Sequence, residues 1–146
     1  MTMAAVRFGV IGADHLHLFQ MVDRLITAGA IAAAHAPNGG LAGRYAGWRK
    51  ESVERSADDI LADDSISLIV VAGIPRERAA VAVAALRAGK HVLSDKPGIT
   101  TMAQLDDVRA AVDAPRLHHQ WLPDETRYEA GAIPDSSKQE LEAMGH

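Results

Sequence analysis

The chain has 146 residues, of which 48% are apolar and 23% charged, a composition typical of one globular domain with a single core. Its formal net charge of −4 offers no basic field to nucleic acid, and the absence of cysteine excludes disulfides and thiolate metal sites. No stretch approaches the roughly 20 apolar residues that cross a bilayer, and the start lacks a signal-peptide pattern. We therefore expect a cytoplasmic protein that binds neither membrane nor nucleic acid.

Short apolar runs alternate with helical patterns over the first 115 residues. The most apolar run, residues 66–73, is rich in β-branched side chains and lacks alternation, as expected of a central parallel strand covered on both faces. Glycines and capping residues separate the elements. We predict strands at residues 6–11, 30–35, 66–73 and 90–95, and helices at about 16–29, 41–50, 57–64, 76–89 and 101–114.

This alternation predicts an α/β domain over residues 1–115, with a doubly wound parallel sheet between two layers of helices. The pattern fails in residues 116–146, which contain two prolines and mixed charge. We interpret that segment as an irregular tail or a truncated remnant, with a short helix near residues 137–144.

Ligands of such sheets bind beyond the carboxyl ends of the strands, where the strand order reverses. Three predicted loops leave strand ends, at residues 12–16, 72–76 and 94–98. Any site is therefore expected to be built from these three loops.

The first loop departs from the glycine-rich pattern that brings backbone amides close to a diphosphate. Gly12, Asp14 and His17 occupy the three glycine positions of G-x-G-x-x-G, so only the first glycine is kept. Two orientations of Asp14 stay open. An outward carboxylate would cap the following helix, whereas an inward one would repel a diphosphate.

A metal is the alternative interpretation of the same loop. Asp14, His15 and His17 are three possible ligands, and the H-x-H spacing is similar to the opening of amidohydrolase barrels. Such a barrel needs about 250 residues, which this chain does not have. The other histidines have no spacing that selects them as further ligands. We keep a small metal-dependent hydrolase as an alternative and predict no metal ligand.

The second and third loops contain cationic side chains. Gly73 allows the chain to pass close to a ligand, and Arg76 and Arg78 open a helix, where we interpret both as solvated. Lys96 lies just past a strand end, and Pro97 restricts its backbone. An ammonium group placed there could polarise a substrate oxygen or donate a proton to it.

Two stretches together carry a family resemblance. "VRFGVIG" (residues 6–12) and "AVAALRAGKHVLSDKPGITT" (residues 82–101) resemble the nucleotide-binding domain of the Gfo/Idh/MocA oxidoreductases, the family of glucose-fructose oxidoreductase and inositol dehydrogenase. The resemblance covers residues 6 to about 112. Its most distinctive part is the family's Glu-Lys-Pro motif, which Asp95, Lys96 and Pro97 match.

The resemblance implies a Rossmann-like fold that binds NAD or NADP, and an oxidoreductase acting on a sugar, polyol or related hydroxy compound. Lys96 is then the expected catalytic residue, since the family's motif lysine helps proton transfer. His35 stands where an acidic residue often binds the adenosine ribose, so the preference between NAD and NADP stays open. The expected cofactor-binding residues are Gly12, Ala13, Asp14, His15, Leu16, Ala72, Gly73, Ile74, Asp95, Lys96 and Pro97.

The chain departs from that family in length. Family members carry a second α/β domain that supplies substrate contacts and the oligomer face, and this C-terminal domain is missing here. We therefore expect a truncated protein, with a small-molecule substrate as partner and homo-oligomerisation left open. A non-catalytic Rossmann-like module without dinucleotide binding is the alternative, because Asp14 and His17 replace two glycines.

Overall fold

The computed structural model describes residues 5–114, 117–120, 125–128, 130–131 and 133–143. The chain divides into two compact units, Met1–Ala111 and Val112–His146. No helix in the described part of the chain is both long and apolar enough to span a membrane.

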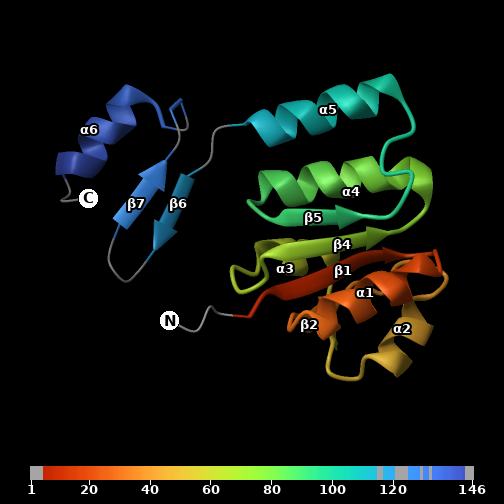
Figure 1. Ribbon diagram of the computed structural model, residues 1–146. Coiled ribbons are helices and arrows are strands. Elements are labelled where there is room, and N and C mark those ends of the chain that lie inside the picture. The colour runs from red at the N-terminus through yellow and green to blue at the C-terminus, as the bar shows by residue number, and fades with distance from the viewer. Residues whose placement is uncertain (1–4, 115–116, 121–124, 129, 132, 144–146) are drawn as a thin grey trace. The chain divides into compact units, whose positions relative to one another are not determined.

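The first unit is built on a parallel sheet of five strands in the order β3-β2-β1-β4-β5 (Figure 1). Because β1 leads to β2 on one side and is flanked by β4 on the other, the strand order reverses between β1 and β4. That position is where doubly wound folds bind their ligands. The strands are β1 (Arg7–Ala13), β2 (Ile31–His35), β3 (Val53–Glu54), β4 (Leu68–Ala72) and β5 (His91–Ser94).

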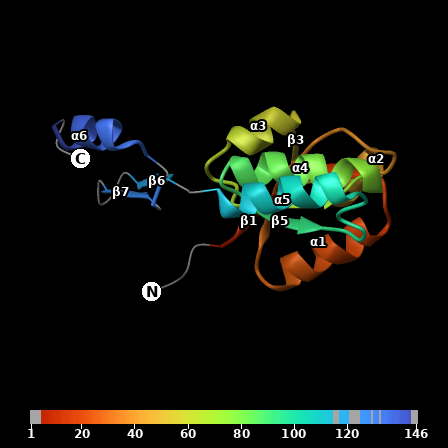
Figure 2. The ribbon, with the colours of Figure 1, turned by 90° about the horizontal axis from the view of Figure 1, so that it is seen from above.

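Helices cover both faces of the sheet, and the view from above separates α1 from α3 and α4 (Figure 2). One buried cluster joins the sheet to α1 and α2, and a second joins it to α3 and α4. This three-layer arrangement confirms the predicted doubly wound α/β fold. The helices are α1 (His17–Thr27), α2 (Ala42–Trp48), α3 (Ala57–Ala62), α4 (Pro75–Arg87) and α5 (Met102–Asp113).

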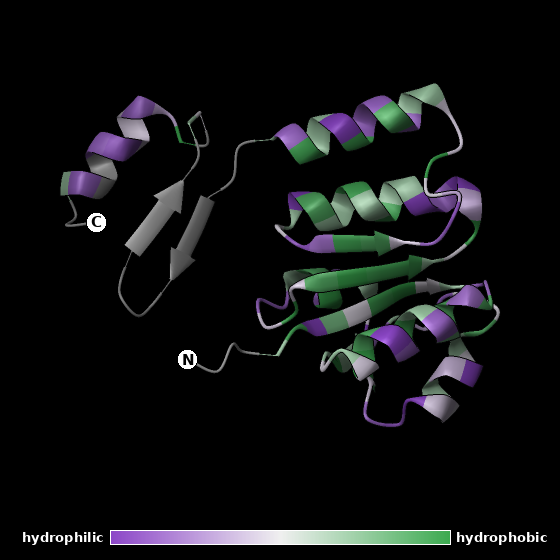
Figure 3. Cartoon of the chain, viewed as in Figure 1, coloured by the Kyte–Doolittle hydropathy of each residue, from purple (hydrophilic) through white to green (hydrophobic). Residues whose placement is uncertain are grey.

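Along the central strands, alternate residues belong to one or the other of the two buried clusters. On β4, Val70 packs with the α1 side, whereas Ile69 and Val71 pack with the α3 side. All three side chains are fully buried, and the hydropathy colouring is hydrophobic over β4 (Figure 3). The continuous apolar run at residues 66–73 is therefore explained by burial on both faces.

Two parts of the architecture differ from the sequence prediction. The edge strand β3 was not predicted, because its two residues are exposed and carry no periodicity. In the second unit, β6 (Leu117–Gln120) and β7 (Glu125–Tyr128) form an antiparallel pair that was not predicted, whereas α6 (Asp135–Ala143) overlaps the helix predicted near residues 137–144. The two strands are short and mostly polar, so the sequence offers no alternation from which to predict them. Residues 116, 121–124, 129, 132 and 144–146 of the predicted tail lie outside the described residues.

His35 ends β2 in a buried position, with 3% of its surface exposed. Its Nδ1 lies 3.0 Å from Ser52 Oγ, and its ring packs edge-on against Tyr45. Burial lowers the pKa of His35 below 6.5, although the Glu54 carboxylate acts in the opposite direction. The histidine that stands at the family's ribose position is therefore part of the core.

Gly12 and Gly43 provide a matched pair of glycine-to-alanine substitutions. Gly12 has a φ of +83°, and a Cβ there would lie 2.9 Å from Gly73 Cα, whereas a Cβ at Gly43 meets nothing within 4 Å. We expect Gly12→Ala to lower the free energy of unfolding by about 2 kcal/mol or more, and Gly43→Ala to leave it unchanged or raise it by up to about 1 kcal/mol. Urea unfolding of both variants checks this. Equal stability of the two would contradict the close contact.

The depressed pKa of His35 predicts a loss of stability in mild acid. Below pH 6.5 the unfolded chain takes up a proton that the folded chain resists, so the free energy of unfolding falls as the pH drops. The slope is at most about 1.4 kcal/mol per pH unit for one histidine. Urea unfolding should show that the free energy of unfolding of His35→Gln depends less on pH than that of the parent protein. The control His91→Gln, at an exposed position, should keep the pH dependence of the parent protein.

Candidate functional site

The loops after β1 and β4 are joined at the carboxyl edge of the sheet by backbone hydrogen bonds. The amides of Asp14 and His15 both donate to the carbonyl oxygen of Ala72, at 3.0 and 3.1 Å. Beside these bonds Gly12 meets Gly73, whose Cα would lie 2.9 Å from a Cβ at Gly12. Gly12, the first glycine of the motif, therefore allows the loops after β1 and β4 to approach each other closely.

Asp14 does not cap α1, so that interpretation is wrong. The N-cap position of α1 is Leu16, which makes no side-chain capping hydrogen bond. Asp14 Oδ1 instead accepts a 2.7 Å hydrogen bond from the Gly40 amide, in the loop that follows β2. Its carboxylate thus joins the loop after β1 to the loop after β2.

The start of α1 retains one free donor. The amides of Gly12 and Ala13 donate to the Asn38 side chain and carbonyl, at 3.2 and 3.1 Å. The Leu16 amide, by contrast, makes no hydrogen bond to another described residue. A free amide at a helix N-terminus is the group that binds a phosphate oxygen.

Asp95 is the centre of the site. It follows β5 and is 6% exposed, yet it carries a carboxylate. Its Oδ1 lies 3.0 Å from His17 Nδ1 and accepts a 2.8 Å hydrogen bond from the Lys96 amide. Its Oδ2 lies 3.1 Å from His15 Nδ1. The first loop and the third loop are thus joined through this one side chain.

A buried guanidinium balances the charge of Asp95. Arg78 is 1% exposed, and its Nη2 lies 3.2 Å from Asp95 Oδ2. Burial raises the pKa of Asp95, but the hydrogen bonds from His17 and the Lys96 amide, together with the charge of Arg78, bring it below its usual range. The group therefore stays ionised at neutral pH.

Arg78 also fixes the second loop against the third. Its Nε donates to the Gly73 carbonyl at 2.7 Å, and its Nη1 donates to the Pro97 carbonyl at 3.3 Å. The interpretation of Arg78 as a solvated surface residue is therefore wrong. Arg76 is exposed beside Glu77, as predicted. The sequence carries no signal that separates the two arginines, since both lie in the first turn of α4.

Lys96 lies on the outer side of the same turn. Its amide is held by Asp95, while its side chain is exposed, and the Lys96–Pro97 peptide bond is cis. The structure thus brings His15, His17, Asp95 and Lys96 to one edge of the sheet, together with Gly73 and Pro97. Asp14 binds the Gly40 amide through Oδ1, and its Oδ2 lies 3.7 Å from where a Cβ at Gly73 would be.

The backbone around α1 fits the diphosphate of a dinucleotide. Gly12 makes the turn with a φ of +83°, the Leu16 amide is a free donor, and α1 supplies the positive end of its dipole. The carboxylate of Asp14 is already engaged by the Gly40 amide, so it keeps a partner of its own in the presence of an anion.

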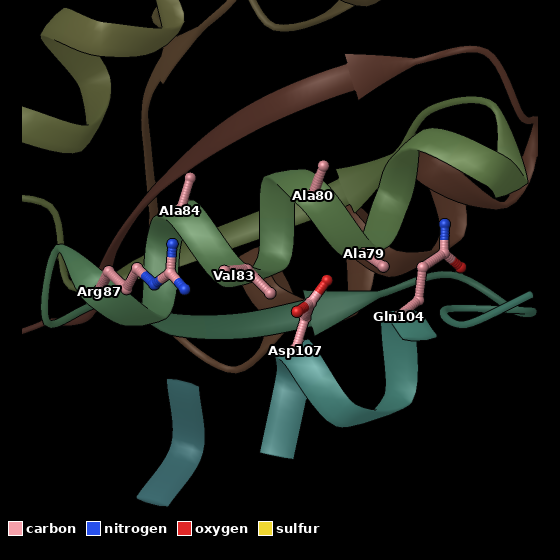
Figure 4. A pocket seen from close by; sticks show the side chains of 7 residues that line it. All are labelled: Ala79, Ala80, Val83, Ala84, Arg87, Gln104 and Asp107. Carbon is pink, nitrogen blue, oxygen red and sulfur yellow. The ribbon is translucent and has the colours of Figure 1, made fainter. Parts of the chain in front are cut away.

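Two hollows of the surface lie away from these loops. One, of about 360 Å³, lies between α4 and α5, whose side chains face one another in Figure 4. The other, of about 390 Å³, lies over α1 and α2. Neither includes a residue of the three loops. The first is lined by Ala79, Ala80, Val83, Ala84, Arg87, Gln104 and Asp107, and the second by Phe19, Gln20, Asp23, Arg44 and Trp48.

Comparison with known proteins relates the chain to oxidoreductases. The Gfo/Idh/MocA model, described as an oxidoreductase family with an NAD-binding Rossmann fold, matches residues 3–122. A putative oxidoreductase from Erwinia carotovora atroseptica superposes with a TM-score of 0.69 and 36% identity, over 73% of this chain and 33% of its own. The 3-ketoreductase KijD10 of Actinomadura kijaniata, solved with NADP and TDP-benzene, superposes with a TM-score of 0.62 and 26% identity, over 74% and 34%.

The chain therefore spans about a third of the length of these solved oxidoreductases. A different relative matches a short segment: the glutathione hydrolase proenzyme of Escherichia coli K12 is 59% identical over 39 residues, which is 27% of this chain and 7% of that protein.

The Arg78–Asp95 pair is expected to be coupled. Arg78→Met leaves a buried carboxylate without its guanidinium, so the free energy of unfolding should fall by about 3–5 kcal/mol. Adding Asp95→Asn removes the stranded charge and should restore part of this loss. Urea unfolding of the single and double variants measures the coupling. The control is Arg76→Met, at an exposed position, whose free energy of unfolding should stay within about 0.5 kcal/mol of that of the parent protein. Additive losses in the double variant would argue against the pair.

Proposed function

Because the chain belongs to the oxidoreductase family with an NAD-binding Rossmann fold, whose model covers residues 3–122, we propose that it is the cofactor-binding part of an NAD(P)-dependent oxidoreductase. NAD or NADP is the proposed cofactor, and the preference between them stays open. When bound, the nicotinamide accepts or donates a hydride.

The observation that carries the proposal is the anchored turn at Asp95, Lys96 and Pro97. Asp95 holds the Lys96 amide at 2.8 Å, so the backbone of the turn is fixed while the lysine ammonium stays exposed at the carboxyl edge of the sheet. A fixed cation at that edge suits a group that orients a substrate oxygen or gives it a proton.

The residues proposed to hold the cofactor surround the same edge. Gly12 and the Leu16 amide face the diphosphate in this proposal, supported by the turn geometry and the free donor. Ala13, Asp14 and His15 complete the first loop, and Ala72, Gly73 and Ile74 form the second. Asp95, Lys96 and Pro97 form the third.

The proposed substrate is a sugar, polyol or related hydroxy compound. KijD10, a 3-ketoreductase solved with TDP-benzene, supports this class at 26% identity. Since the chain spans about a third of the length of such proteins, we expect cofactor binding without turnover from this chain by itself. Homo-oligomerisation and a cytoplasmic location stay predictions.

We also infer that the glutathione hydrolase match lies mainly in the second unit. The match is 39 residues long, close to the length of Val112–His146, and its share of 27% complements the 73% that the Erwinia oxidoreductase covers. We therefore assign no oxidoreductase chemistry to residues 123–146, which lie beyond the family match.

A non-catalytic module without dinucleotide binding is the second candidate. The observation in its favour is that the amides of residues 12–15 all donate within the chain, which leaves the Leu16 amide as the free donor of this loop. A dinucleotide would then have fewer backbone contacts than in a loop with three glycines.

Titration with NADH and NADPH, followed by fluorescence, decides between the two candidates. We expect saturable binding that Gly12→Val abolishes, because a branched side chain cannot enter the contact with Gly73. Lys96→Ala should weaken binding severalfold, whereas the exposed Lys50→Ala serves as a matched control and leaves it unchanged. Circular dichroism checks that Gly12→Val is folded. Absence of binding by the parent chain up to millimolar cofactor would exclude the first candidate.

A further inference from the structure

We propose that His15, His17 and Asp95 form a binding site for a divalent transition metal ion, with Zn²⁺ the best fit. One ligand atom from each residue lies within 4.8 Å of the others. His15 and His17 come from the loop and first turn that follow β1, and Asp95 follows β5. The cluster shares His15 and Asp95 with the residues proposed to hold the cofactor, but the metal proposal does not depend on cofactor binding.

An unsatisfied contact at the centre of the cluster points to a cation. The His17 amide donates to His15 Nδ1 at 3.3 Å, so this ring nitrogen presents its lone pair. The same nitrogen lies 3.1 Å from Asp95 Oδ2, which is buried and makes no hydrogen bond within the described structure. A cation at this position would give Asp95 Oδ2 the partner that it lacks, and it would take the place of the His17 amide at His15 Nδ1.

The neighbouring guanidinium does not satisfy this contact. Arg78 Nη2 lies 3.2 Å from Asp95 Oδ2, where it forms an ion pair without hydrogen-bond geometry. It balances the charge of the carboxylate but leaves Asp95 Oδ2 without a hydrogen bond. Asp95 Oδ1 lies 3.0 Å from His17 Nδ1, which brings the second imidazole to the same carboxylate.

The spacing of the ligand atoms matches a tetrahedral ion. Bonds of about 2.0–2.2 Å to Zn²⁺ place two ligand atoms about 3.3–3.6 Å apart, and the imidazole nitrogens lie 3.0 and 3.1 Å from the two Asp95 oxygens. Since the three ligand atoms lie within 4.8 Å of one another, the proposal requires side-chain rotations that bring them around one ion. Two imidazoles and a carboxylate form a ligand set typical of zinc.

Burial and orientation also suit a metal. The side chain of Asp95 is 5% exposed and is held by Arg78 and the Lys96 amide, whereas His15 and His17 are 49% and 38% exposed. A fixed carboxylate beneath two accessible imidazoles gives an ion both an anchor and an entry path. Three protein ligands leave a fourth position open for an oxygen from water or a small molecule.

The ligand set differs from the one that the sequence favours. Asp14 neighbours both histidines in the chain, but its carboxylate binds the Gly40 amide. Asp95 takes its place from 78 residues away. Asp14→Asn is therefore an informative control, since it removes a carboxylate from the same loop and leaves the proposed ligands intact.

The test is a titration of the untagged full chain, freed of metal by chelation, with Zn²⁺ in a calorimeter and with Co²⁺ in an absorption spectrometer. We expect one Zn²⁺ per chain and the visible Co²⁺ bands of a tetrahedral site. His15→Gln, His17→Gln and Asp95→Asn should each weaken the affinity for Zn²⁺ at least tenfold and abolish the Co²⁺ bands. Asp14→Asn and His91→Gln should retain both.

Equal Zn²⁺ affinity in the parent chain and in His15→Gln and His17→Gln would overturn the proposal, as would loss of the Co²⁺ bands in Asp14→Asn instead of Asp95→Asn. If Asp95→Asn unfolds, which circular dichroism detects, the two exposed histidine variants decide the outcome. NADH titration with and without Zn²⁺ keeps the two questions apart, because cofactor binding and metal binding are then measured separately on the same chain.

Discussion

The buried carboxylate of Asp95 is the interaction on which the carboxyl edge of this domain depends. Removing a carboxylate from water costs several kcal/mol unless charge and hydrogen bonds replace the lost hydration. Here Arg78 supplies the charge, and His17 with the Lys96 amide supplies the contacts to Oδ1. Each partner comes from a different loop, so satisfying one buried group also places the three loops relative to one another.

The same buried carboxylate explains why the residues proposed to bind a dinucleotide and those proposed to bind a metal lie close together. Lys96 is exposed because Asp95 fixes its backbone, and His15 and His17 are turned toward Asp95 because that carboxylate needs partners. In the two proposals, a dinucleotide would use the amide end of α1 and the lysine, whereas a metal would use the imidazoles and the carboxylate. These atoms lie on neighbouring residues of the same two loops, so binding of one ligand is expected to affect binding of the other.

The length of the chain limits what this edge can do. In the solved oxidoreductases, the part that matches this chain makes up about a third of the protein. An exposed lysine and half-exposed histidines are consistent with an edge that is open to solvent.

Local signals in the sequence determined the fold and the three loops. The apolar run at residues 66–73, the alternating elements and the stretch "GKHVLSDKPG" suffice for a parallel sheet with a site at its carboxyl edge, because periodicity and turn residues act over short distances. Only the tertiary structure decided which polar groups meet there. Asp95 and His17 are 78 residues apart, Asp14 binds Gly40 instead of capping α1, and Arg78 is buried while Arg76 is exposed. Such pairings follow from the desolvation of each group in the folded chain, which no local pattern encodes.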